Sequence, residues 1–188
     1  MTPAYVRTIR EELFYEYARL VSRSRFGTIE KGSTTDTFRE LCGTGVSFPE
    51  SIPEERAPAE SGECVYCGTP DNLTKDYLVP ITRGGTDSTD NETTVCKLCK
   101  SSRGEKGIFE WLGLREKNHL HRWTASRYLK LLYLLHEQAG TLDIGVSTLN
   151  KLCAVCTLHD VCERWNTVGR LTCLCLESVL PATSQARA

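Results

Sequence analysis

The first apolar pattern of the chain runs from residue 6 to residue 23 and has the spacing of an amphipathic helix. Its apolar positions lie three or four residues apart, so their side chains share one face. They are Val6, Ile9, Leu13, Tyr17 and Leu20. Gly27 follows, and glycine commonly ends a helix. We expect a helix that packs on its apolar face and exposes its charged residues.

This periodicity is lost between residues 32 and 62, where polar residues and prolines prevail. Pro49, Pro53 and Pro58 interrupt regular structure. We expect a connecting segment here, with one short helix around residues 36–41.

Helical periodicity returns in the second half of the chain. Residues 108–117 predict one helix and residues 122–138 another, which should end near Gly140. The longer helix has its apolar residues at Trp123, Tyr128, Leu131, Leu132 and Leu135. Ser147 is suited to cap a further short helix that runs into Cys153.

The composition indicates a globular chain. Its 188 residues are 40% hydrophobic and carry a net charge of −1. The longest apolar run, from Leu131 to Leu135, is too short to cross a bilayer, so no membrane contact is expected. No secretion signal opens the chain, and we expect a cytoplasmic location. In a reducing compartment the ten cysteines are better interpreted as metal ligands than as disulfide partners.

Two C-x2-C motifs form the strongest chemical pattern. Cys64 and Cys67 make up the first motif, and Cys96 and Cys99 the second. Four thiolates in two such pairs can complete a tetrahedral zinc site, with each pair on a tight turn. We therefore predict a structural zinc ion held by these four residues.

The residues between and after these motifs have an order of their own. Asp76-Tyr77-Leu78-Val79-Pro80 comes first, followed by Arg83-Gly84-Gly85, Asn91 and, after the second motif, Lys100-Ser101-Ser102-Arg103-Gly104. From Cys64 to Lys106 this order resembles the HNH endonuclease family. The resemblance implies a compact unit of two antiparallel strands, a loop and a helix.

The resemblance also implies a mechanism. In that family a histidine after the aspartate is the general base for the attacking water, and the middle asparagine orients it. The aspartate and a final asparagine or histidine hold one divalent ion, Mg²⁺ or Mn²⁺, on the scissile phosphate. By this resemblance Asp76 would hold the ion, and Tyr77, Asn91 and Lys100 would occupy the other catalytic positions.

Two of these positions depart from the family pattern, since Tyr77 replaces the histidine and Lys100 the second metal ligand. A tyrosine with a lowered pKa can act as base or nucleophile, whereas an ordinary strand aromatic cannot. A third alternative is a relocated base, for which His119 and His121 are the candidates. Lys100 can bind the phosphate directly, or it can pair with Asp76 across an inactive site.

A basic stretch follows the second motif. It runs from Lys97 to Lys130 and contains nine basic residues and three acidic ones. Three aromatic residues lie within it: Trp111, Trp123 and Tyr128. Such a stretch can grip phosphates and stack on bases, although its aromatic residues can equally face a core. We expect DNA as the partner, with RNA as the alternative. The residues expected to contact phosphates are Arg83, Lys97, Arg103 and Lys106.

A second group of cysteines lies near the C-terminal end. Cys153, Cys156 and Cys162 have a C-x2-C-x5-C spacing, which is similar to part of the iron–sulfur ligand pattern of DNA-repair glycosylases and some nucleases. We expect Cys173 as the fourth ligand; the alternatives are Cys175, Cys42 and His159. Thiolates suit a 4Fe-4S cluster or a second zinc ion, and buried structural thiols are the non-metal alternative. A metal here would clamp a small helical module.

Together these patterns predict an α+β chain that is mostly helical. Residues 1–57 would form an N-terminal helix and linker, residues 58–118 an HNH-like module with zinc, and residues 119–188 a cysteine-rich helical module. The predicted function is metal-dependent hydrolysis of DNA phosphodiester bonds. The alternatives are a non-catalytic, zinc-stabilised nucleic-acid-binding module and an iron–sulfur protein that senses redox state.

Overall fold

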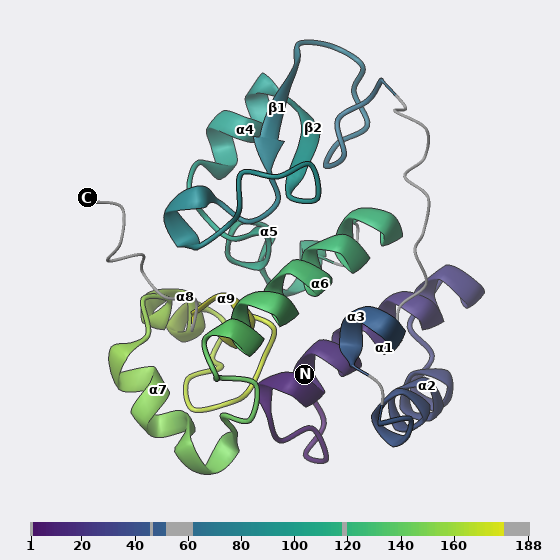
Figure 1. The fold of residues 1–188 in the computed structure, drawn as a ribbon, viewed down its shortest axis with the longest axis vertical. Coiled ribbons are helices and arrows are strands. Elements are labelled where there is room, and N and C mark those ends of the chain that lie inside the picture. Colours follow the sequence, from purple (N-terminus) through teal and green to yellow (C-terminus); the bar gives the residue numbers. More distant parts are fainter. Residues whose placement is uncertain (1, 46, 52–61, 118–119, 179–188) are drawn as a thin grey trace.

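The computed structural model describes residues 2–45, 47–51, 62–117 and 120–178. Over these residues it is a helical body with a small antiparallel sheet at one end, as Figure 1 shows. The predicted α+β class is confirmed. Both predicted boundaries, after residues 57 and 118, fall outside the described residues, so the division into three parts stays a prediction. No described helix is long and apolar enough to cross a membrane.

The predicted N-terminal helix is confirmed as α1 (Ile9–Phe26). Thr8 and Glu11 begin it with a reciprocal capping box, in which each side chain accepts from the other residue's backbone N–H. Gly27 ends it in the left-handed region at a φ of 73°, and its N–H donates to Arg23 O at 2.8 Å. These local signals fix both ends of the helix.

Two further helices cover α1. Helix α2 (Lys31–Gly43) packs along it and is longer than the predicted helix around residues 36–41. Helix α3 (Phe48–Ser51) is a single turn. It places Phe48 in the core, where the ring stacks on Tyr133 with 5.4 Å between centroids. The polar segment that begins at residue 32 thus contributes more to core packing, through α2 and Phe48, than its composition predicts.

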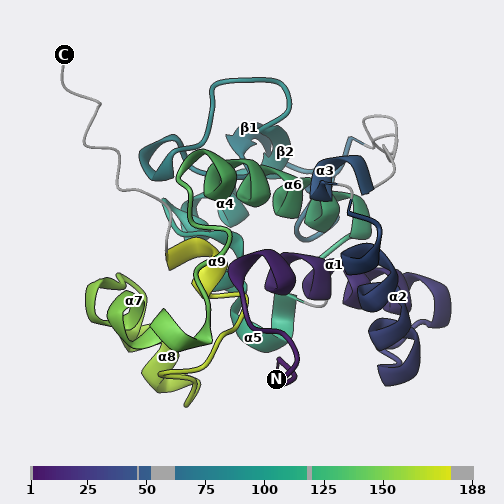
Figure 2. The same ribbon diagram turned by 60° about the horizontal axis from the view of Figure 1, so that its bottom comes forward.

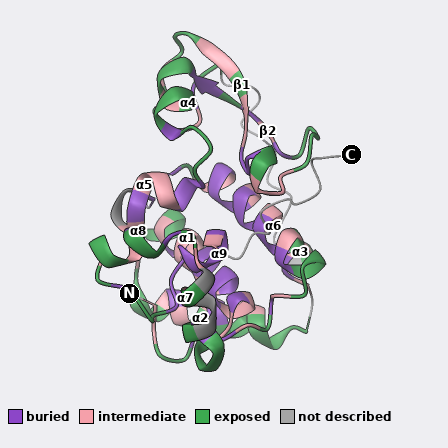
Figure 3. Cartoon of the chain, turned by 90° about the vertical axis from the view of Figure 1, so that its left-hand side faces the viewer, coloured by how far each residue is buried: buried purple, intermediate pink, exposed green. Residues whose placement is uncertain are grey.

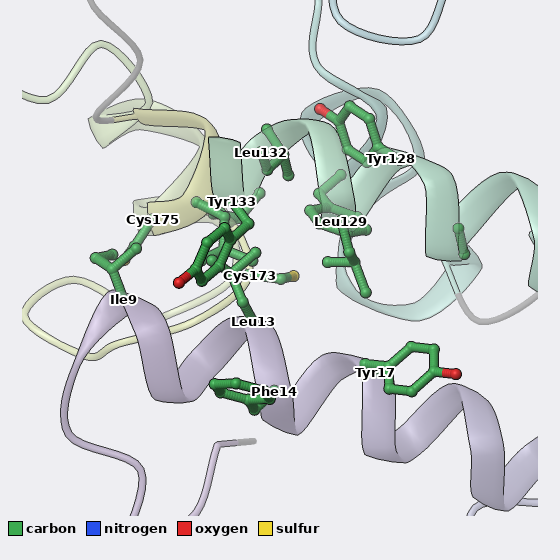
Figure 4. Packing of buried hydrophobic residues seen from close by; sticks show 14 of the residues in the cluster. Ile9, Leu13, Phe14, Tyr17, Tyr128, Leu129, Leu132, Tyr133, Cys173 and Cys175 are labelled. Carbon is green, nitrogen blue, oxygen red and sulfur yellow. The ribbon is translucent and has the colours of Figure 1, made fainter. Parts of the chain in front are cut away.

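The predicted helix over residues 122–138 is confirmed as α6 (Arg122–Gln138). It runs along α1, as Figures 2 and 4 show, and the apolar faces of the two helices form the main core. His121 begins α6, since its Nδ1 accepts from Trp123 N at 3.3 Å. Fully buried residues of this interface are Ile9, Leu13, Leu129 and Leu132.

The chain after α6 folds back against α1 and ends in short helices. They are η3 (Val146–Thr148), α7 (Leu149–Val155), α8 (His159–Arg164) and α9 (Cys175–Ser178). The expected short helix into Cys153 is confirmed as α7, but Ser147 lies inside η3 and does not cap it. Within α9, the Glu177 carboxylate accepts from Phe109 N at 2.6 Å and from Tyr128 Oη at 2.5 Å, which ties this end to the centre of the molecule.

The sheet consists of β1 (Leu73–Tyr77) and β2 (Glu92–Cys96), paired antiparallel with Asp76 opposite Thr93. A 3-10 turn, η1 (Ile81–Arg83), lies between them. After β2 come α4 (Lys97–Arg103) and α5 (Ile108–Glu116). Figure 3 shows β1, β2 and α4 at the outer end of the molecule. Leu78 and Val79 belong to the main core, so this unit is anchored on the helical body.

A group of charged side chains is buried beside α1. Glu16 accepts from Lys117 Nζ at 2.7 Å and from Arg19 Nη1 at 2.9 Å. Burial alone would raise the pKa of Glu16, but these two cations outweigh it and lower the pKa. Glu12 is fully buried, and burial together with the Glu16 charge raises its pKa to about 8. The fold therefore keeps Glu12 protonated at neutral pH.

Because the fold keeps Glu12 protonated, we expect the free energy of unfolding to fall as the pH rises. An unfolded Glu12 releases its proton near its ordinary pKa of 4.5, whereas the folded protein holds it up to about pH 8. Its contribution is complete below pH 4.5 and is lost as the pH rises toward 8, with a limit of about 1.4 kcal/mol per pH unit. Urea unfolding at a series of pH values should show Glu12→Gln with a shallower decline than the parent protein. The exposed Glu137→Gln is the control, and equal slopes in all three proteins would contradict this protonation state.

Candidate functional site

The two C-x2-C motifs come together as one cluster. Cys64 and Cys67 lie on the turn before β1, Cys96 ends β2, and Cys99 is in the first turn of α4. Their four sulfur atoms all lie within 4.8 Å of one another. The Cys67 and Cys96 sulfurs are 3.7 Å apart, and tetrahedral zinc with bonds of about 2.3 Å requires about 3.8 Å. The donor set therefore fits the predicted zinc ion.

Backbone geometry prepares these turns for a metal. Gly68 adopts a φ of 74°, and its N–H donates to Cys64 O at 2.8 Å, which closes the first turn. The N–H of Cys99 donates to the Cys96 sulfur at 3.3 Å. This hydrogen bond lowers the pKa of Cys96 to about 7 and favours the thiolate that a metal binds.

Asp76, the predicted ligand of the catalytic ion, is surrounded by cations. Its Oδ2 accepts from Arg103 Nη1 at 3.2 Å, and its Oδ1 lies 4.0 Å from Lys100 Nζ. Among the described residues, only two groups of three or more ligand-type side chains lie close together. They are the four-cysteine cluster and the group of His159, Asp160 and Glu163. Among the described residues Asp76 is therefore in no group of three or more ligand-type side chains, and its carboxylate faces two cations, which disfavour a divalent ion beside it.

Arg103 has a structural role that its position in a basic stretch did not reveal. Its side chain is 1% exposed, so the prediction that it contacts phosphates is wrong. Five oxygen atoms accept from its guanidinium at 2.7–3.2 Å. They belong to Tyr66, Asp76, Tyr77, Leu78 and Lys106. Arg103 therefore joins α4 to β1 and to the first cysteine turn.

Tyr77 points away from this ion pair toward the loop. Its hydroxyl donates to Asp87 Oδ1 at 2.6 Å. That hydrogen bond raises the pKa of Tyr77, which is the opposite of the shift that a base or nucleophile needs. Of the other candidate bases, His121 caps α6, and His119 lies outside the described residues.

Asn91 is fully buried and holds the loop between the strands. Its amide accepts from Val79 N at 2.8 Å and donates to Val79 O at 2.8 Å and to Thr86 O at 2.9 Å. A Cβ on Gly85 would lie 2.7 Å from this amide and 2.0 Å from Val79 O, so glycine is required there. In this conformation Asn91 shapes the loop and does not contact Tyr77 through any of these hydrogen bonds.

Of the basic residues predicted to bind phosphate or to occupy a catalytic position, three are exposed on the surface. Lys97, Lys100 and Lys106 are exposed, although Lys100 Nζ also donates to Lys75 O at 2.6 Å. Arg83 instead pairs with Glu110 at 2.7 Å and is largely covered. The exposed basic surface of the unit is therefore the outer side of α4 and the segment that follows it.

The aromatic residues of the basic stretch lie mostly in packing positions. Tyr128 is fully buried in the core, which is the second of the two alternatives for these aromatic residues. Trp111 packs edge-on against Tyr66 and donates to Ser102 Oγ at 3.1 Å. The Arg127 guanidinium lies over the Trp123 ring at 4.9 Å.

The second group of cysteines is divided by the structure. Cys153, Cys156 and Cys162 are half-buried at α7 and α8, and Cys175 begins α9. Cys173, the predicted fourth ligand, is buried in the main core, and no three of these described cysteines bring their sulfurs within 4.8 Å of one another. Cys42 is exposed on α2.

Comparison with known proteins identifies the class of the unit around the four-cysteine cluster. A family model described as HNH endonuclease matches residues 64–107, the stretch that contains β1, β2 and α4. The resemblance seen in the sequence is thereby confirmed, and we call residues 64–107 the HNH module. Members of that family are nucleases, whose substrates are nucleic acids. The search of curated proteins and the search of solved structures both gave no match.

Loss of a zinc ligand should unfold this module. Cys99→Ser removes one of four thiolates, and structural zinc supplies a large part of the folding free energy of small metal-bound units. We expect zinc content to fall from one ion per chain and the melting transition of the module to disappear, measured by elemental mass spectrometry and calorimetry. The exposed Cys42→Ser is the control. A Cys99→Ser protein with the parent's zinc content and melting temperature would contradict the site.

Proposed function

We propose that this protein binds nucleic acid through the HNH module, with the outer face of α4 against the phosphate backbone. The observation that carries this proposal is the ion pair of Asp76 with Arg103, with Lys100 Nζ 4.0 Å from the same carboxylate. A cation thus stands at the position where the family resemblance would require a metal ligand.

The exposed lysines are better suited to bind a phosphate group than to hold a metal ion. Lys97 and Lys100 are three residues apart on α4, so they lie on the same side of the helix. An ammonium group offers three donors and no lone pair, so it can bind a phosphate oxygen but not a metal. Lys106 adds a third exposed charge after the helix. DNA is the expected partner, as the sequence predicted.

Hydrolysis of DNA is the second candidate function, because residues 64–107 match an endonuclease family and Asp76 is retained. A Mg²⁺ or Mn²⁺ ion would supply charge neutralisation at the phosphate. For this, the exposed Lys100 side chain would have to leave Asp76. Tyr77, which stands where the family has its general base, donates its hydroxyl proton to Asp87.

Binding through α4 predicts a defined salt dependence. Lys100→Ala and Lys97→Ala should each weaken binding to a short DNA duplex and lower the slope of log K against log salt by about 1 for each lost phosphate contact. Gel shifts without added Mg²⁺ or Mn²⁺, at several salt concentrations, measure this slope. Lys31→Ala, an exposed lysine of α2, is the matched control. Unchanged slopes in both α4 variants would contradict the assignment of the outer face of α4 as the surface that binds DNA.

Restoring the two residues that the HNH family uses should restore metal-dependent cleavage of DNA. The double substitution Tyr77→His and Lys100→Asn supplies the base and the second ligand that the family uses, so we expect metal-dependent nicking of supercoiled plasmid to appear or to rise at least tenfold. A third substitution, Asp76→Asn, should abolish that gain. Strong nicking by the parent protein with Mg²⁺ or Mn²⁺, lost in Asp76→Asn, would instead establish the second candidate function.

A further inference from the structure

Helix α4 carries one large apolar side chain on its outer surface. Leu98 is 78% exposed, which is more than any other large hydrophobic residue that the structure describes. It belongs to neither apolar core, whereas the next residue, Cys99, packs against the small core of the HNH module. Figure 3 shows α4 at the outer end of the molecule. Packing inside the protein therefore does not explain a leucine at this position.

The turns of α4 place Leu98 beside the exposed lysines. At 3.6 residues per turn, four exposed residues follow one another around the outer side of the helix in the order Lys100, Lys97, Ser101 and Leu98. Arg103 falls on the opposite side, where it is buried. The outer side thus has a basic edge and an apolar edge, with a small polar residue between them. Such a surface can bind phosphates at its basic edge and meet base edges with its apolar edge.

We propose that Leu98 contacts the 5-methyl group of thymine in the major groove of DNA, while Lys97 and Lys100 bind phosphates at the rim of that groove. This contact presupposes the proposed function, in which the outer face of α4 lies against DNA. The thymine methyl is the apolar group that the major groove displays, and that groove is about 12 Å wide and admits an α-helix. Helix α4 has seven residues and is therefore about 10 Å long, so it fits within the groove.

The size of the apolar surface favours a methyl group over a protein partner. Helix α4 and the two strands of the module lie within the described part of the chain, and they expose no other large apolar side chain. Stable protein interfaces bury about 800 Å² on each partner around an apolar centre. A single leucine beside a serine and two lysines offers far less apolar area. A base methyl with phosphates nearby matches both the size and the charge of this surface.

The contact gives the module a base preference that phosphate binding does not supply. Phosphates are the same in every sequence, so Lys97 and Lys100 position the helix without selecting bases. The Leu98 side chain has no hydrogen-bond donor or acceptor, so it selects thymine through the methyl group alone. The protein therefore favours duplexes that carry thymine where Leu98 reaches the groove.

The test compares two short duplexes of alternating sequence, one made of dA and dT and the other of dA and dU. Their phosphates and hydrogen-bonding groups are the same, and only the thymine methyl differs. The full-length protein is used with zinc bound and without added Mg²⁺ or Mn²⁺, and fluorescence anisotropy measures both dissociation constants. We expect the dissociation constant to rise about fourfold when dU replaces dT, the factor expected from burial of one methyl group.

Three variants assign this preference to Leu98. Leu98→Ala should bind both duplexes equally and keep the salt slope of the parent protein, because no cation is lost. Leu98→Met keeps an apolar side chain of similar volume and should keep most of the preference. Val146→Ala is the control, since Val146 is 51% exposed in η3, outside the HNH module. All three should have the zinc content and melting temperature of the parent protein, because both positions are exposed.

Equal binding of both duplexes by the parent protein would overturn the proposal, as would a preference for dT that survives in Leu98→Ala. A rise in the fluorescence of 2-aminopurine placed beside thymine would also overturn it, because Leu98 would then separate stacked bases. If Lys97→Ala and Lys100→Ala lower the salt slope while either result is obtained, the α4 face stands and the role of Leu98 fails. No binding of either duplex would contradict the proposed function itself, and this contact with it.

Discussion

The buried guanidinium of Arg103 is the interaction on which the HNH module depends. Its five acceptor oxygens belong to the first cysteine turn, β1, the residue that follows β1 and the segment after α4. A charge this deeply buried is strongly destabilising without a carboxylate partner, typically by about 3–5 kcal/mol. Asp76 is the only carboxylate among these acceptors, so its first task in this fold is structural.

The four-cysteine cluster and the basic side chains of the module are both positioned by helix α4. Helix α4 has seven residues, and Cys96 and Cys99 tie its first turn to the four-cysteine cluster. Once that turn is fixed, the helix directs Arg103 into the module and presents Lys97 and Lys100 outward. The resemblance to the HNH family implies a catalytic ligand at the position that Lys100 occupies in α4.

The features that could be predicted from the sequence are those that depend on residues close together along the chain. The cysteine spacing predicted the four-cysteine cluster because each C-x2-C pair needs only one tight turn, and the apolar periodicity predicted α1 and α6. Burial was harder to predict. Arg103 lies in a basic stretch and was expected on the surface, but five oxygens from distant positions satisfy it. The roles of Tyr66 and Asp87 have no signal in the sequence, since each depends on a contact across the module.

Asp76 pairs with cations of the chain, and we propose that it does not hold a divalent ion. Electron paramagnetic resonance of the zinc-loaded protein titrated with Mn²⁺ tests this directly, with Asp76→Asn as the reference because an amide keeps a hydrogen bond to Arg103 and removes the charge. We predict that the parent protein and Asp76→Asn bind Mn²⁺ equally weakly. One saturable Mn²⁺ site in the parent, absent from Asp76→Asn, would contradict the account.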